Sequence, residues 1–143
     1  MGIAGRCTAK LLLALFVFPA LSHAHEGRID ITLTHAGPDS VGKRLAQSIR
    51  TELALSKLMT LVKASDDRIG VYLVTMRRGG ESPGTIYSVT WTLGGMTDDG
   101  YLTSRVGSCD AGSVRACARR LVAETDTHAR VLFTIRHNHP PVR

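Results

Sequence analysis

The chain has few of the features that nucleic-acid-binding proteins need. Aromatic residues make up only 5% of its 143 residues, and no block of five or six like charges occurs. Proteins that bind single strands set exposed aromatic side chains among many basic ones. Because Tyr87 and Trp91 alternate with polar residues, we expect them to face the core, which leaves no stacking platform. The sequence therefore argues against nucleic acid as a partner.

Familiar catalytic motifs are missing as well. There is no Gly-x-Ser-x-Gly, no His-Glu-x-x-His and no cysteine with an evident histidine partner. The segment Gly37–Lys43 matches the glycine and lysine spacing of a phosphate-binding P-loop. However, Arg44 stands where the magnesium-binding hydroxyl should be, and Pro38 removes an N–H donor. We interpret this segment as a capped helix start, and we expect neither enzymatic activity nor a cofactor.

One pair of adjacent carboxylates could in principle serve catalysis. Asp98 and Asp99 lie beside Gly100, where Asp and Gly are favoured by turn geometry. A hydrolase or toxin-like enzyme would have to join one of these carboxylates to a histidine, and the sequence spacing does not indicate such a pocket.

The chain also has no apolar run long enough to cross a bilayer, which takes roughly 20 residues. Its longest run, Leu11–Phe18, follows the basic residues Arg6 and Lys10 and precedes Ser22-His23-Ala24, which has the small residues of a cleavage site. This pattern predicts a signal peptide over residues 1–24, cleaved after Ala24. Residues 25–143 would then form a single periplasmic or secreted domain with flexible polar termini and no stable membrane anchor. Its 16 basic and 12 acidic residues would give a net charge of +4.

Only three cysteines are present. Cys7 would leave with the leader, so Cys109 and Cys117 would meet in an oxidising compartment. Cys117 lies on the apolar side of a predicted helix, and Cys109 lies just before it. We predict a structural disulfide, because a redox pair normally has Cys-x-x-Cys spacing. Closing such a short loop stabilises the fold by about 2–3 kcal/mol.

Apolar periodicity predicts six strands and two helices. In chain order they are a strand at 29–34, a helix from Gly37–Ser40 to Leu53, strands at 59–63, 69–76, 87–93 and 101–106, a helix at 113–125 and a last strand at 131–135. The strand Ile69–Met76 is apolar on both faces, as expected of a central strand. The order β-α-β-β-β-β-α-β indicates an α+β fold with two layers. We expect a mostly antiparallel sheet of five or six strands with two helices on one face.

This pattern resembles the N-terminal domain of the periplasmic protein TolB and related envelope-assembly modules. The segments that carry the resemblance are VGKRLAQSIRTEL, LMTLVKA, the hairpin YSVTWTL to YLTSRVGSC, and VRACARRLVAETD. The resemblance implies a domain that docks onto an envelope complex, and it assigns no functional residue.

Arg115, Arg119 and Arg120 lie on the outward side of the second predicted helix and form a candidate partner-binding row. Glu124 stands four residues after Arg120, the spacing of a helical ion pair. An exposed sheet edge that accepts an added strand is the other candidate surface. We therefore predict a non-enzymatic exported adaptor whose partner is a protein or other component of the envelope.

Histidines near both ends of the predicted mature chain indicate an alternative function, metal binding. A mature N-terminal His25 would offer an amino group and an imidazole, and His137 and His139 form His-x-His near the other end, with His35 closing the first strand. Imidazole suits copper and zinc. A periplasmic copper- or zinc-binding protein that uses His25, His137 and His139 is therefore the alternative function.

Overall fold

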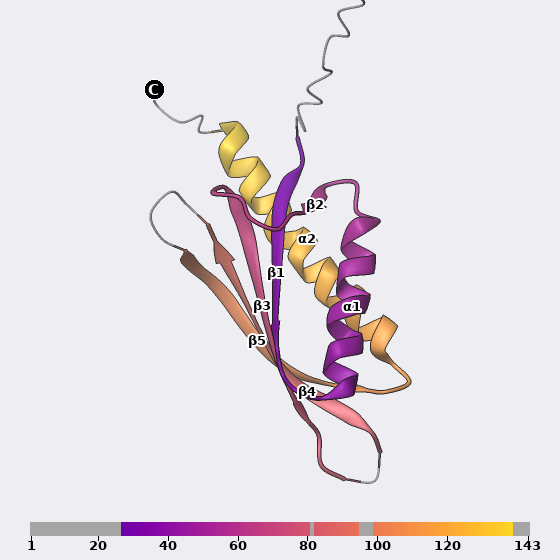
Figure 1. The fold of residues 1–143 in the computed structure, drawn as a ribbon. Coiled ribbons are helices and arrows are strands. Elements are labelled where there is room, and N and C mark those ends of the chain that lie inside the picture. The colour runs from indigo at the N-terminus through magenta and orange to yellow at the C-terminus, as the bar shows by residue number, and fades with distance from the viewer. Residues whose placement is uncertain (1–26, 81, 95–98, 139–143) are drawn as a thin grey trace, which may run out of the picture.

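The computed structural model describes residues 27–80, 82–94 and 99–138 (Figure 1). Within these residues the chain forms five strands and two helices. In chain order they are β1 (Ile29–Ala36), α1 (Ser40–Ala54), β2 (Met59–Leu61), β3 (Arg68–Arg77), β4 (Gly84–Leu93), β5 (Gly100–Asp110) and α2 (Val114–Asn138). The predicted leader and cleavage site lie outside the described residues.

The strands form one mixed sheet in the order β2-β1-β3-β4-β5. Strand β1 pairs in parallel with both β2 and β3, whereas β3, β4 and β5 form an antiparallel meander. Helix α1 carries the chain back to the end of the sheet where β1 began, which is what parallel pairing requires. The expected two-layer α+β fold is confirmed.

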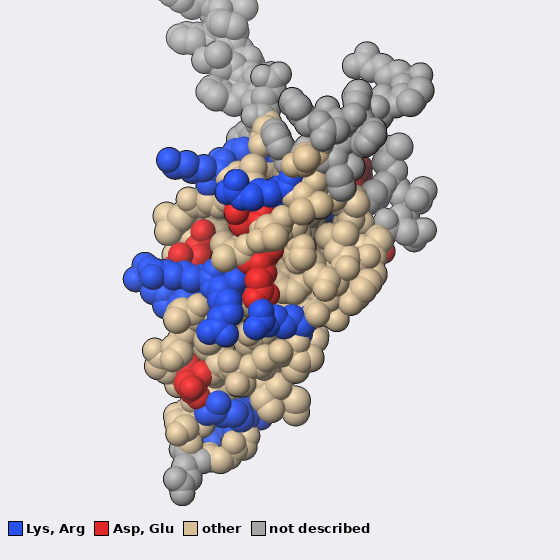
Figure 2. Space-filling view, turned by 180° about the vertical axis from the view of Figure 1, so that it is seen from behind, with Lys and Arg blue, Asp and Glu red and all other residues tan. Residues whose placement is uncertain are grey.

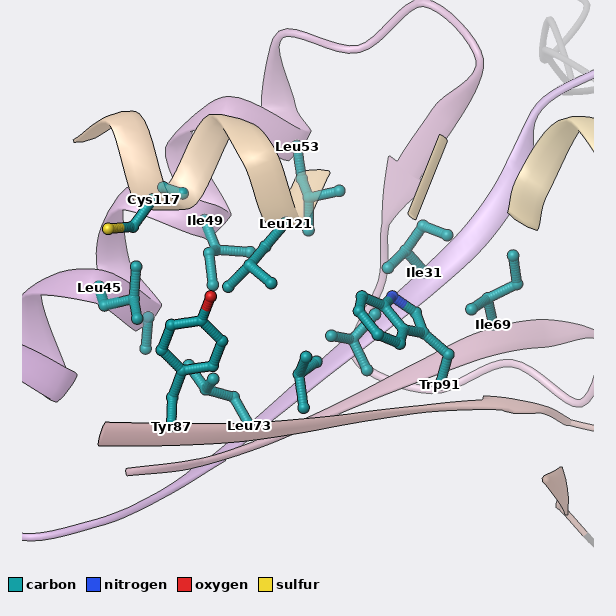
Figure 3. Close-up of a cluster of buried hydrophobic side chains, with 14 of the residues drawn as sticks. Ile31, Leu45, Ile49, Leu53, Ile69, Leu73, Tyr87, Trp91, Cys117 and Leu121 are labelled. Atoms are coloured by element: carbon teal, nitrogen blue, oxygen red, sulfur yellow. The ribbon is translucent and has the colours of Figure 1, made fainter. Parts of the chain in front are cut away.

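The core lies between the sheet and the two helices. Alternate residues of β3 and β4 point into it, among them Leu73, Tyr87 and Trp91, all 2% exposed or less. They pack against apolar side chains of the helices, including Leu45 of α1 and Leu121 of α2 (Figure 3). Every second side chain of these strands and the apolar stripe of each helix thus meet in one buried layer.

Helix α1 begins with a cap from its own sequence. The Asp39 carboxylate accepts a hydrogen bond from the Gly42 N–H at 2.6 Å. A Cβ atom on Gly42 would lie 2.1 Å from Thr75 Oγ1, so the first turn packs directly on β3. The segment that resembles a P-loop is therefore a capped helix start in which the Asp39 side chain occupies one of the N–H groups that a phosphate would need.

The predicted last strand at residues 131–135 is wrong. These residues belong to α2, which continues past Thr125 to Asn138 for a total of 25 residues. The apolar stripe that includes Cys117 and Leu121 is extended by Ala129 and Leu132, both buried. The segment contains several β-branched residues, which favour strands. It is helical because helical spacing brings Ala129 and Leu132 into the core, and β propensity depends on such packing.

Cys109 and Cys117 form the predicted disulfide. It joins the end of β5 to the first turn of α2, and the two cysteines are eight residues apart in the chain. Both half-cystines are buried, at 2% and 6% exposure. The bond therefore fixes α2 to the end of β5.

Candidate interaction surface

Both helices cover one side of the sheet, and within residues 27–80, 82–94 and 99–138 no element covers the other side. We call the outward positions of β1, β3, β4 and β5 the open face. Strand register places these residues there: Thr32, Thr34, Ala36, Gly70, Tyr72, Val74, Met76, Ile86, Ser88, Thr90, Thr92, Tyr101, Ser104, Val106 and Ser108. These residues are uncharged at neutral pH, and the charged outward positions, Asp30, Arg68 and Asp110, lie at the ends of their strands.

Four apolar side chains gather at one end of the open face. We call Val74, Met76, Ile86 and Val106 the apolar cluster. Their exposed fractions are 54%, 61%, 37% and 72%. They line a shallow hollow of about 230 Å³. Soluble proteins rarely leave several large apolar side chains together in water unless another molecule binds there.

An ion pair closes each end of the open face. Arg78 pairs with Asp110 beside the apolar cluster. At the other end Arg68 pairs with Asp99 at 3.0 Å, and the Tyr72 hydroxyl donates to the same carboxylate at 2.8 Å. Charged groups are thus confined to the rim, where they neutralise each other, as at many protein interfaces.

These contacts also answer the question about the carboxylate pair. Asp99 accepts hydrogen bonds from Arg68, Tyr72 and Thr92, so its role is to tie the loop to the sheet. Asp98 lies outside the described residues.

Strand β5 is the long edge of the sheet. It has eleven residues and pairs with β4 on one side, and no described strand lies on its other side. Its sequence contains neither proline nor lysine, two residues that commonly protect an edge from further pairing. Its one arginine, Arg105, lies on the helix side of the sheet and pairs with Glu124 of α2. The pairing that we expected of Glu124, with Arg120, is not the one that forms.

The ladder between β4 and β5 shows which backbone groups of β5 face outward. The Ala111 N–H donates to the Pro83 carbonyl at 3.0 Å, just beyond the end of β5. Because bonded pairs alternate in an antiparallel ladder, Cys109 and Gly107 bond to β4. Ser108 and Val106 therefore direct their N–H and C=O groups away from the sheet.

The predicted arginine row has a structural role. Arg115 and Arg119 both contact the Glu52 carboxylate of α1, at 3.2 and 3.4 Å, and so join the two helices. Arg120 has no recorded ion pair among the described residues. Seen from behind, basic side chains gather with acidic ones between them (Figure 2). Two of the three arginines are thus already paired within the molecule.

The structure brings no metal site together in the part of the chain that it describes. No group of three or more His, Cys, Asp or Glu side chains is found there. His35 Nε2 lies 2.9 Å from Thr75 Oγ1, and burial, with Arg50 nearby, lowers its pKa. His25 and His139 lie outside the described residues, and His137 belongs to α2.

Sequence reasoning missed the open face. The apolar pattern of Ile69–Met76 predicts a strand covered on both sides, but Tyr72, Val74 and Met76 lie on the side that no described element covers. The signal was present in the element count, since two helices of this size cover only one face of a sheet.

No protein-family model and no curated protein matches the chain. Among solved structures, the chain matches the hypothetical protein CT253 from Chlamydia trachomatis, a minor lipoprotein from Acinetobacter baumannii, and protein XCC0632 of the DUF330 family from Xanthomonas campestris.

The match to the Chlamydia protein has a TM-score of 0.53 at 8% identity and covers 73% of this chain and 99% of that one. The match to the Acinetobacter lipoprotein has a TM-score of 0.42 at 11% identity and covers 75% and 94%. The match to the Xanthomonas protein has a TM-score of 0.46 at 12% identity and covers 68% of this chain and 83% of that one. The first match shows a shared fold, and at this identity it shows nothing about activity. A likeness to the TolB domain is not among these findings.

Among the described residues, no helix is both long and apolar enough to cross a membrane.

Proposed function

We propose that this chain is an exported, non-enzymatic adaptor domain that docks onto a protein of the cell envelope. Its partner would supply an extended segment that pairs with the free edge of β5. The observation that carries the proposal is the unprotected eleven-residue edge. Such an edge offers a row of donors and acceptors to an incoming strand, as in other cases of strand addition.

Side chains beside this edge would give the pairing its selectivity. Val106 is 72% exposed, and it borders both the edge and the hollow of the apolar cluster. Side chains of an added strand alternate between the two faces. We therefore expect the partner segment to carry an apolar residue that lies next to Val106 on the open face.

Export is supported by the predicted signal peptide and by the disulfide. Cytosolic proteins rarely keep such bonds, whereas periplasmic and secreted ones do. The Cys109–Cys117 bond therefore fits a domain that works outside the cytosol.

The test blocks one outward backbone donor. The substitution Ser108→Pro removes an N–H that faces away from β4 and so leaves the ladder to β4 intact. Ser108→Ala is the matched control, because it removes the same hydroxyl and keeps the N–H. We would crosslink the tagged chain in its native envelope and identify captured proteins by mass spectrometry.

We expect one dominant envelope protein, lost with Ser108→Pro and retained with Ser108→Ala. Equal capture by both variants, or no capture above background, would contradict strand addition. Charge reversal at Arg120, which forms no ion pair among the described residues, separates the edge from the helix surface and keeps the pairs of Arg115 and Arg119 with Glu52. If that reversal alone abolishes capture, the partner binds the helices.

A further inference from the structure

We propose that the open face is covered by the open face of a second copy of this chain, in a two-fold homodimer. This inference does not depend on the strand-addition proposal, because the β5 edge stays accessible when two sheets stack face to face. It rests on charge, on shape and on the size of the face.

Charge distinguishes the open face from the helix side. The two helices contain eight basic and three acidic residues, and the whole chain has a net charge of +6. Two copies that approached through their helices would repel each other. The open face has no charged side chain between its two rim ion pairs, so a second copy meets no like charge there. Depletion of charge at the centre is the compositional mark of an interface.

Shape makes the face complementary to itself. Tyr101 is 68% exposed and lies at one end, with its hydroxyl 3.1 Å from Ser104 Oγ. The hollow of the apolar cluster lies at the other end, six residues along β4, or about 20 Å at about 3.4 Å per residue. A two-fold axis between these points would place Tyr101 of each copy over the apolar cluster of the other. Such reciprocal contact is what a two-fold interface requires.

The middle of the face suits the stacking of two sheets. Thr34, Ser88 and Thr90 are short. The larger Tyr72, between Thr34 and Thr90, is 36% exposed, and its hydroxyl is bonded to Asp99. Packed sheets lie about 10 Å apart, which leaves room for two layers of such side chains.

The face is the size of a small interface. Four strands about 4.8 Å apart and about seven residues long span a flat area of roughly 450 Å². The protruding side chains add to the accessible area of the face. Specific interfaces bury about 800 Å² on each partner. We therefore expect a dimer that dissociates on dilution.

The experiment is sedimentation equilibrium of the purified chain over a range of concentrations. Met76→Asp places a charge on the open face, on a strand that is not at the edge. Val131→Asp is the matched control, because it places the same charge at an exposed apolar position of α2. Neither side chain belongs to the core, and circular dichroism would check that both variants are folded.

We expect the wild type and Val131→Asp to dimerise, and Met76→Asp to raise the dissociation constant at least tenfold. A wild type that stays monomeric at every concentration overturns the proposal, as does a dimer that Met76→Asp leaves unchanged. Ser108→Pro separates stacking from edge pairing. A dimer that this variant abolishes and Met76→Asp preserves is formed through β5, which also contradicts the proposal. If Ser108→Pro loses envelope capture and keeps the dimer, both proposals hold. A wild type that dimerises but captures no envelope protein would count against strand addition alone.

Discussion

Asp39 links the start of α1 to the strand behind it. Burial alone would raise the pKa of its carboxyl. The hydrogen bond from the Gly42 N–H, together with the nearby hydroxyls of Thr75 and Thr85, outweighs burial, so the pKa lies below its ordinary value of 3.8. The folded state therefore favours the ionised carboxylate. The stabilisation is fully present above the unfolded pKa and is lost as the pH falls through the folded pKa.

We expect Asp39→Ala to lower the free energy of unfolding by about 1 kcal/mol at pH 7, the usual cost of losing an N-cap. The difference from wild type should shrink below about pH 4, because the unfolded carboxyl takes up a proton there before the folded one does. Urea denaturation at pH 7 and pH 3 measures both effects. The exposed neighbour Ser40, changed to Ala, is the control. A difference that is equally large at pH 3 would show that the ionised form is not what stabilises the helix.

A second residue-scale prediction concerns the one tryptophan. Trp91 Nε1 donates to the buried Thr125 Oγ1 at 2.9 Å, and Thr125 Oγ1 donates in turn to the Leu121 carbonyl. Thr125→Val would leave the indole N–H without its acceptor, at a cost of about 1–3 kcal/mol. Thr127→Val is closely matched, because the exposed Thr127 makes the same bond to the carbonyl four residues earlier. We would compare urea unfolding followed by tryptophan fluorescence, and equal stability of the two variants would contradict the role of the buried pair.

At the scale of elements, the disulfide gives the clearest prediction. Replacing Cys109 and Cys117 by serine releases the end of β5 from α2. We expect the free energy of unfolding to fall by about 2–3 kcal/mol, because the unfolded chain is no longer constrained. Wild type in the presence of a reductant should show the same loss, which separates the bond from the effect of the serines. Unchanged stability in both experiments would mean that the bond does not stabilise the fold.

The elements that could be predicted from sequence are those with a single regular period. Alternation in β4 and the stripe of α1 have one buried side each, and local spacing suffices to place them. The two errors have a tertiary origin. The end of α2 is rich in β-branched residues and is helical because Ala129 and Leu132 reach the core. The outward side chains of β3 are apolar although no described element covers them, and their pattern alone is that of a buried strand.

At the scale of the whole molecule, the two sides of the domain differ in chemistry. The helix side is basic and has several ion pairs, such as that of Arg115 with Glu52. The centre of the open face has no charged side chain. Sequence analysis selected the arginine row because charge is conspicuous in a sequence. The open face and the β5 edge depend on which strands are neighbours, and one chain read along its length does not give that order. The predicted partner-binding arginines therefore remain a prediction, beside two surfaces that only the fold displays.

The sheet order also determines the order in which the domain can assemble. Strands β3, β4 and β5 are joined by short connections, so their contacts are local and close quickly. Strand β1 is the first strand in the chain, yet its partner β3 lies 38 residues further on, as the pairing of Asp30 with Arg68 shows. Closing that loop costs more entropy than closing a hairpin. We therefore expect the strand that is made first to be among the last to pair, which would leave the edge of β3 unpaired until β1 docks.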